Sequence, residues 1–229
     1  MKLLAFDTAT EMCSVALYIE GRVLVREQEL SQGHGALLLP MIDGLLGEAG
    51  LALAALDVIA FGRGPGGFTG VRLAASVAQG LAYGAALPVL PISDLLAVAQ
   101  RAFAARPAAR RVLVCNDARV SEVYSAVFER EDAQSLPALC GAEQVLSPQA
   151  VRLPRSPRVT VGAGRGFRAY PQLRAQLGSQ LAEVFDDLLP TAQSMLPQAL
   201  SDWRQGLGLA AAAAQPVYLR DNVARPAVT

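Results

Sequence analysis

The sequence predicts an α/β protein built from two related lobes with mixed sheets. A chain of 229 residues is long enough for two lobes that each have a core of their own. The first 105 residues alternate between apolar strands and helices in the order βββαβαβα, and the opening pattern then recurs after residue 111. We therefore expect an N-terminal lobe over residues 1–105 and a diverged repeat of it over residues 106–229.

The first lobe opens with three strands and a helix. Residues 3–6 form a short strand of the buried type, and residues 14–19 and 22–30 form a hairpin around Glu20-Gly21. Apolar residues at helical spacing predict a helix over residues 34–46. Because Pro40 is tolerated near the beginning of a helix, we place this start between residues 35 and 39.

Two further strand–helix pairs complete the first lobe. Residues 58–61 form a buried strand that leads through a glycine-rich loop into a helix at 68–83. Residues 87–91 form the next strand, and Ser93 caps a helix that runs to Ala105.

The second lobe repeats the start of the first one. The segment "LLAFDTATEMCSVALY" at 3–18 and the segment "VLVCNDARVSEVYSAVF" at 112–128 share an apolar strand, an aspartate, a polar turn and a second strand. Asp7 and Asp117 occupy equivalent positions, so we expect each at a strand tip before a hairpin. The remainder predicts a strand at 159–161, helices at 166–177 and 190–204, and an extended segment, "PVYLRDNVA", that rejoins the fold.

Composition narrows the function classes. Twenty basic and twenty acidic residues cancel, so net charge alone does not direct the chain to nucleic acid or to an anionic membrane. The cysteines Cys13, Cys115 and Cys140 are odd in number and form no C-x-x-C pair, which fits a reducing compartment. The chain shows neither a signal peptide nor an apolar run of membrane-spanning length. We expect a cytoplasmic protein that makes no membrane contact.

The loop "GRGPGGFTG", residues 62–70, formally matches the dinucleotide-binding pattern G-x-G-x-x-G. Its context argues against phosphate binding: it follows the fourth strand, and the next strand ends in Pro91-Ile92 with no acid at its tip. Pro65 also removes a backbone N–H donor from the loop, and no Gly-Lys-Ser/Thr follows. Nucleotide binding by this loop is therefore disfavoured.

The helix after the loop carries a stripe of small residues. Gly70, Ala74, Ala78 and Ala82 recur every four residues, with Ala75 beside them, so one side of the helix is nearly bare backbone. Such a stripe favours close packing, either of the helix on its own sheet or of two subunits on each other. The sequence leaves both alternatives open.

Candidate catalytic and metal sites are sparse. His34 is the only histidine, and position 38 is Leu, so the two-histidine pattern of a helical metal site is missing; we expect neither a metal nor a catalytic residue. The two aspartate tips resemble the phosphate loops of actin-like ATPases but have no glycine in their turns, which disfavours ATP hydrolysis. The candidate vestigial nucleotide site comprises Asp7, Thr8, Thr10, Asp117, Gly162 and Gly164.

Six arginines fall between Glu143 and Glu183 with no acid among them. This run could contact an RNA phosphate backbone, but no aromatic alternation accompanies it, so a solvated surface is the favoured interpretation. The six are Arg152, Arg155, Arg158, Arg165, Arg168 and Arg174.

Five motifs in order resemble the TsaB family, also called YeaZ, over essentially the whole chain. They are "LLAFDTAT…SVALY", "GHGALLLPMI", "LDVIAFGRGPGGFTGVRLAASVAQGLA", "NDARVSEVY" and "PVYLRDNVA". The resemblance implies an actin-like fold of duplicated ribonuclease-H-like lobes. It also implies a non-catalytic subunit needed for threonylcarbamoyl modification at N6 of the adenosine next to the tRNA anticodon.

The resemblance further implies partners. The chemistry would belong to TsaD, a metal-bearing paralogue of the same fold, and TsaE, a P-loop ATPase, would join the complex that meets tRNA. The chain would pair with TsaD, or with itself, through the helices at 34–46 and 68–83. The expected interface residues are His34, Leu37, Leu38, Met41, Ile42, Leu45, Phe68, Val71, Arg72, Ala74, Ala75 and Ala78.

The chain departs from the usual family pattern at Gly67 and at Gly35-Ala36, where polar residues are common, so specific polar contacts there are in doubt. No cofactor is expected, although weak or interface-shared binding of ATP or ADP stays open. Two other functions were weighed: a degenerate actin-fold ATPase, and the glycopeptidase that older labels of relatives suggest. No Ser/His/Asp or Cys/His arrangement supports the second.

Overall fold

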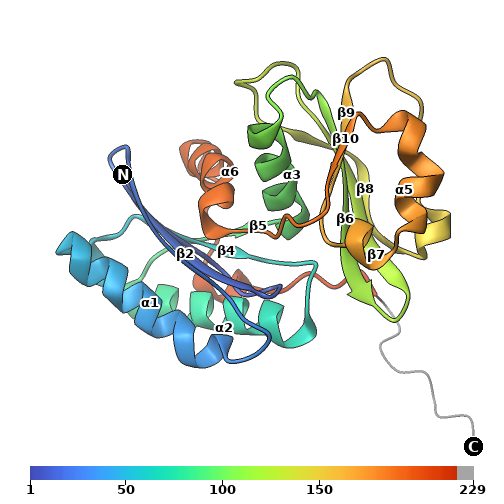
Figure 1. Cartoon of the computed structure of the whole chain (residues 1–229). Coiled ribbons are helices and arrows are strands. Elements are labelled where there is room, and N and C mark those ends of the chain that lie inside the picture. Colours follow the sequence, from blue (N-terminus) through green and yellow to red (C-terminus); the bar gives the residue numbers. More distant parts are fainter. Residues whose placement is uncertain (221–229) are drawn as a thin grey trace, which may run out of the picture.

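A computed structural model describes residues 1–220 of the chain and contains two five-stranded mixed sheets (Figure 1). The first sheet consists of β1 (Lys2–Asp7), β2 (Met12–Ile19), β3 (Arg22–Glu29), β4 (Val58–Gly62) and β5 (Val89–Ile92). The second consists of β6 (Arg111–Arg119), β7 (Glu122–Glu129), β8 (Ala138–Leu146), β9 (Thr160–Ala163) and β10 (Glu183–Phe185). The helices are α1 (His34–Ala49), α2 (Phe68–Ala85), α3 (Asp94–Ala105), α4 (Gly166–Ala169), α5 (Gln172–Leu177) and α6 (Ala192–Arg204).

The two sheets share one topology. The first has the order β3-β2-β1-β4-β5 and the second the order β8-β7-β6-β9-β10. In each, the opening strand is antiparallel to the second strand and parallel to the fourth, so β1 and β6 are equivalent. Asp7 ends β1 and Asp117 lies near the end of β6. The α/β fold class with two related lobes, of the actin-like type, is confirmed.

Helices cover both faces of the first sheet. In Figure 1, α1 and α2 lie along one face, and α3 and α6 lie on the side of the other. The first pair shares one buried cluster with β1, β2 and β4, whereas α6 packs against the opposite side of the same strands. Helix α3 also packs against β6, β7 and β9 of the second sheet. The lobe boundary predicted at residue 105 stays a prediction. Helix α6 follows this boundary in the sequence but packs on the first sheet.

The small-residue stripe of α2 faces its own sheet. Ala74, Ala75, Ala78 and Ala82 are buried within the cluster that α1, α2 and the first sheet form. With methyl groups instead of longer side chains on this side, the helix axis can approach the strands closely. Of the two alternatives that the sequence left open, packing on the sheet is therefore confirmed.

Most predicted elements are present, with differences at their ends. Helix α1 begins at His34, so Pro40 lies further inside the helix than expected, at an exposed position. Ser93 caps α3 as predicted, because its Oγ accepts a hydrogen bond from the Leu96 amide. The helix predicted at 166–177 is instead two short helices interrupted at Tyr170-Pro171.

Strands β8 and β10 were not predicted. Most of β8 is exposed, and its sequence "ALCGAEQVL" lacks the alternation of a half-buried strand. Strand β10 has only three residues, too few to show any period. The extended segment predicted near the C-terminus does rejoin the fold, because the Val217 amide bonds the Arg63 carbonyl; residues 221–224 of that segment lie outside the described residues.

We predict that Ala78→Leu destabilises the chain by about 1–3 kcal/mol, because the added methylenes have no space between α2 and the sheet. Urea denaturation of the isolated protein measures the change. Ser76→Leu is the matched control: Ser76 is exposed on the same helix, and its replacement should alter the free energy of unfolding by no more than about 0.5 kcal/mol. Equal effects of the two variants would contradict the packing described here.

Candidate functional site

The structure divides the twelve expected interface residues into two groups. Five retain exposed surface: His34, Leu37, Met41, Phe68 and Arg72. The other seven are buried in the chain's own core and cannot touch a partner while the fold is intact, which corrects the expectation for them. These seven are Leu38, Ile42, Leu45, Val71, Ala74, Ala75 and Ala78.

The outward-facing residues of α1 and α2 form a second candidate surface, which we call the outer helix face. Sixteen residues of the two helices are exposed, and only Asp43, Glu48 and Arg72 are charged, so the face is poor in charge for two surface helices. Leu39 is 49% exposed and Tyr83 is 83% exposed. Five glycines also leave backbone uncovered, because a Cβ at any of them would meet no atom of another segment within 4 Å; they are Gly35, Gly44, Gly47, Gly80 and Gly84.

An aromatic stack borders the outer helix face at the start of α2. The Arg72 guanidinium carbon lies 3.2 Å from the Phe68 ring centroid and 5.2 Å from that of Tyr218. Arg72 Nε also donates a 2.7 Å hydrogen bond to the Tyr218 hydroxyl. The C-terminal segment is thereby fixed to the first turn of α2, and the Arg72 charge is held between two rings.

The glycine loop lies against the tip of β1. The Gly67 amide bonds the Ala9 carbonyl at 2.7 Å, and Thr8 Oγ1 donates to the Gly70 carbonyl at 2.7 Å. A Cβ at Gly66 would overlap the backbone of Ala9, and one at Gly70 would overlap the Thr8 carbonyl oxygen. The glycines are thus needed for close contact between two backbone segments of this chain, and the Gly67 amide, one donor that a phosphate could use, is already bonded to Ala9.

The candidate nucleotide residues do not gather at one site. A cleft of about 770 Å³ lies between the lobes and is lined by Thr8, Thr10 and Asp117. Asp7 is fully buried outside this lining. Gly162 and Gly164 are also absent from it, and the space beside Gly162 holds the Phe167 ring.

Asn116 is a cleft residue that the sequence interpretation missed. It is 5% exposed, and neither its amide nitrogen nor its amide oxygen has a hydrogen-bond partner among residues 1–220. Its position directly before Asp117 at the tip of β6 was the available signal, because strand ends carry the residues that line such clefts.

Ion pairs tie the two lobes together around the cleft. Arg119 pairs with Glu11 at 2.8 Å, and Arg165 pairs with Glu29 at 2.6 Å. The hydrogen bond from Arg165 lowers the pKa of the Glu29 carboxyl below its ordinary value. One member of each pair is well exposed, Arg119 and Glu29 respectively, so each pair contributes little to stability and is screened by salt.

Most of the six arginines of this run pair with acids from other segments. Arg158 pairs with Glu129 and Glu131, and Arg174 pairs with Asp186 at 3.0 Å. Arg168 pairs with Asp187, which also contacts Arg165. Four of the six arginines are thus paired with acids, and Arg152 and Arg155 form no ion pair within residues 1–220.

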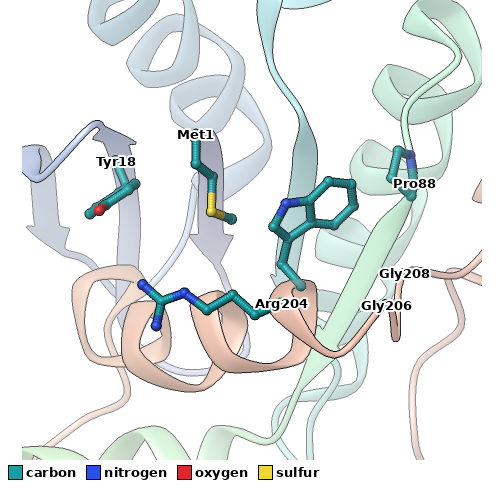
Figure 2. A pocket seen from close by; sticks show the side chains of 7 residues that line it. Met1, Tyr18, Pro88, Arg204, Gly206 and Gly208 are labelled. Carbon is teal, nitrogen blue, oxygen red and sulfur yellow. The ribbon is translucent and has the colours of Figure 1, made fainter.

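A second cavity, of about 620 Å³, lies at the end of α6 (Figure 2). Met1, Tyr18 and Pro88 line it together with Trp203. The Arg204 side chain runs along the helix below Met1 in Figure 2, and it forms no ion pair with any residue between 1 and 220. The lining is mostly apolar and contains no pair of groups suited to acid–base chemistry.

Two further features bear on function. Within residues 1–220, no three His, Cys, Asp or Glu side chains are grouped closely enough to hold a metal ion. None of the helices described combines the length and the apolar character that a membrane span requires.

Comparison with known proteins places these features in a family. The chain is 41% identical over 226 residues to the tRNA threonylcarbamoyladenosine biosynthesis protein TsaB of Escherichia coli, covering 98% of this chain and 96% of that protein. It is 40% identical to the protein of the same name from Haemophilus influenzae, over 97% and 95% of the two chains. The chain belongs to the TsaB family. A model of a related family, described as TsaD, tRNA N6-adenosine threonylcarbamoyltransferase, matches residues 25–228.

A solved structure agrees with this assignment. YeaZ from Pseudomonas aeruginosa is 43% identical, and the superposition has a TM-score of 0.84 with 95% of this chain and 99% of that chain covered. The two lobes and their connections thus follow those of a TsaB-family protein along almost the whole chain.

We predict opposite effects for two Gly→Ala substitutions within α2. Gly70→Ala should destabilise the chain by at least about 1 kcal/mol, because the Cβ must displace the backbone of Thr8. Gly80→Ala should stabilise it by up to about 1 kcal/mol, because Gly80 faces open space and Ala favours the helix. Thermal or urea unfolding of the isolated variants measures both, and a stabilising Gly70→Ala would refute the close contact.

Proposed function

We propose that this chain is a non-catalytic subunit of the complex that attaches threonylcarbamoyl to N6 of the adenosine next to the tRNA anticodon. In this proposal the outer helix face docks a TsaD-type transferase and stabilises its active form. The names of the TsaB relatives support the pathway, and the match to the TsaD model supports a paralogue of similar fold as the partner.

The observation that carries the proposal is the character of the outer helix face. Charged residues are depleted at the centres of protein interfaces, and exposed apolar side chains beside uncovered backbone permit close helix packing. Leu39 and Tyr83 are the exposed apolar side chains of this face, and Gly80 and Gly84 leave helix backbone uncovered so that a partner can approach closely. In the absence of the transferase we expect the same face to pair two copies of this chain.

The proposal assigns no reaction to this chain. Asp7 is fully buried and lies outside the cleft lining, and His34, the single histidine, has no second histidine at position 38. TsaE would join the larger cytoplasmic complex, and tRNA would be met through the assembly. An ATPase acting through Asp7 is disfavoured because no cleft surface reaches that carboxyl.

We predict that Leu39→Asp or Tyr83→Asp weakens binding to the TsaD-type subunit by about 30-fold or more, the effect of losing an interface anchor of about 2 kcal/mol. Leu139→Asp is the control, because Leu139 is similarly exposed on β8 of the second lobe. Calorimetric titration with the purified transferase measures the affinities, and tRNA modification in the reconstituted mixture measures the functional result. Unchanged affinity in both helix variants, or equal loss in the control, would refute docking at this face.

A further inference from the structure

Two acidic side chains meet inside the first lobe, away from the cleft and from the outer helix face. Asp7 ends β1, and Asp94 is the first residue of α3, two positions beyond the end of β5. Strand β4 lies between β1 and β5 in the sheet and ends at Gly62. Both carboxyl groups are fully buried. The sequence analysis found no acid at the tip of β5, but the first turn of α3 brings Asp94 to that place.

Gly62 shows how closely the two carboxyls approach. A Cβ at Gly62 would lie 2.7 Å from Asp94 Oδ1 and closer still to Asp7 Oδ1. The acids therefore occupy the space that a side chain at the end of β4 would need. Glycine at this position is required by the carboxyl pair.

Each acid uses one oxygen to bind the backbone. Asp7 Oδ1 accepts from the Ala9 amide at 2.9 Å, and Asp94 Oδ2 accepts from the Gly64 amide. The remaining oxygens, Asp7 Oδ2 and Asp94 Oδ1, are buried and receive no N–H or O–H donor from residues 1–220. Both carboxyl groups occupy the space beside Gly62, and two carboxylates can bond each other there only through a proton that one of them holds.

The surroundings offer little compensation for two negative charges. Arg63 is the cation that acts on Asp94, but its guanidinium is paired with Glu143 of β8 at 3.0 Å. Cys13 on β2 is the other titratable group that faces Asp7, and Ser14 beside it bonds the Ala192 amide of α6. Two ionised carboxylates in this enclosed space would repel each other at a high cost in free energy.

We propose that Asp7 and Asp94 share one proton at neutral pH and that this proton locks the start of α3 to the tip of β1. Helix α3 packs against both sheets, so the lock fixes the first lobe relative to the second. Gly64 is held to Asp94 by two hydrogen bonds. Its amide donates to Asp94 Oδ2, and its carbonyl accepts from the Asp94 amide at 3.1 Å. Release of the proton frees the glycine loop and α3 together.

The difference in pKa between the folded and the unfolded chain decides whether stability rises or falls with pH. Desolvation raises the pKa of Asp7 to about 6 and holds the pKa of Asp94 well above its ordinary value, so the folded chain keeps a proton that the unfolded chain releases above about pH 4. The stability that the retained proton contributes is complete below the pKa of aspartate in the unfolded chain. It is lost as the pH rises through the pKa of the pair in the folded chain.

The test compares the full chain with Asp94→Asn, whose amide can donate to Asp7 at every pH and still accept from Gly64. From pH 5 upward, the unfolding constant of the wild type relative to Asp94→Asn should rise about tenfold per pH unit until the pair loses its proton. Glu27→Gln, which removes an exposed carboxylate, should show no such rise. A flat ratio for Asp94→Asn between pH 5 and 7 would overturn the shared proton.

Two further measurements test the protonation state of the pair and its effect on the glycine loop. Carbon-13 spectra of aspartate-labelled wild type at pH 7 should contain one protonated buried carboxyl, and two ionised ones would overturn the proposal even if Asp94→Asn failed to fold. Above the pH at which the ratio levels off, amides of residues 62–71 should exchange several-fold faster in the wild type than in Asp94→Asn. Equal exchange would overturn the lock.

Discussion

The close contact between the glycine loop and the tip of β1 is the constraint on which the first lobe depends. Side chains at Gly66 or Gly70 would overlap the backbone of Ala9 or Thr8, so only glycine lets β4 turn into α2 at this distance. The contact sets where α2 begins, and the alanines of that helix then bring it down onto the sheet. A loop whose spacing resembles a phosphate cradle is thus used to join two parts of one chain.

The placement of α2 decides which residues face outward. Because the small side chains pack inward, the opposite side of the helix presents Gly80, Tyr83 and Gly84, and α1 beside it presents Leu39. The same inward packing removes seven of the expected interface residues from the surface. In the proposed function, burial and docking use opposite sides of the same two helices, and the low charge of the outer side is the feature that favours a protein partner.

Much of the fold was predictable because its signals are local. Apolar runs, the Ser93 cap and the likeness of residues 3–18 to residues 112–128 each depend on neighbouring residues, and they yielded the element order and the paired aspartate tips. Strand β8 escaped prediction because it is mostly exposed and lacks a period, and the packing of α6 on the first sheet depends on contacts remote in sequence. The partner and the pathway came from family resemblance and not from physical patterns.

The site was less predictable than the fold. Sequence spacing alone could not tell which side of α2 is buried, since a stripe of alanines fits a sheet as well as a subunit. Asp94 was not singled out in the sequence, because its approach to Asp7 arises from the order β1-β4-β5, with Gly62 between them. The pattern that would have revealed the pair is an acid at the end of β1, a glycine at the end of β4 and an acid two residues beyond the end of β5.

Hydrogen exchange measured with and without a purified TsaD-type subunit tests the central claim most directly. We expect slower exchange confined to peptides that cover the exposed residues of α1 and α2, within 34–49 and 68–85, with the second sheet unchanged. Slower exchange centred on β8 or α5, with α1 and α2 unaffected, would contradict it.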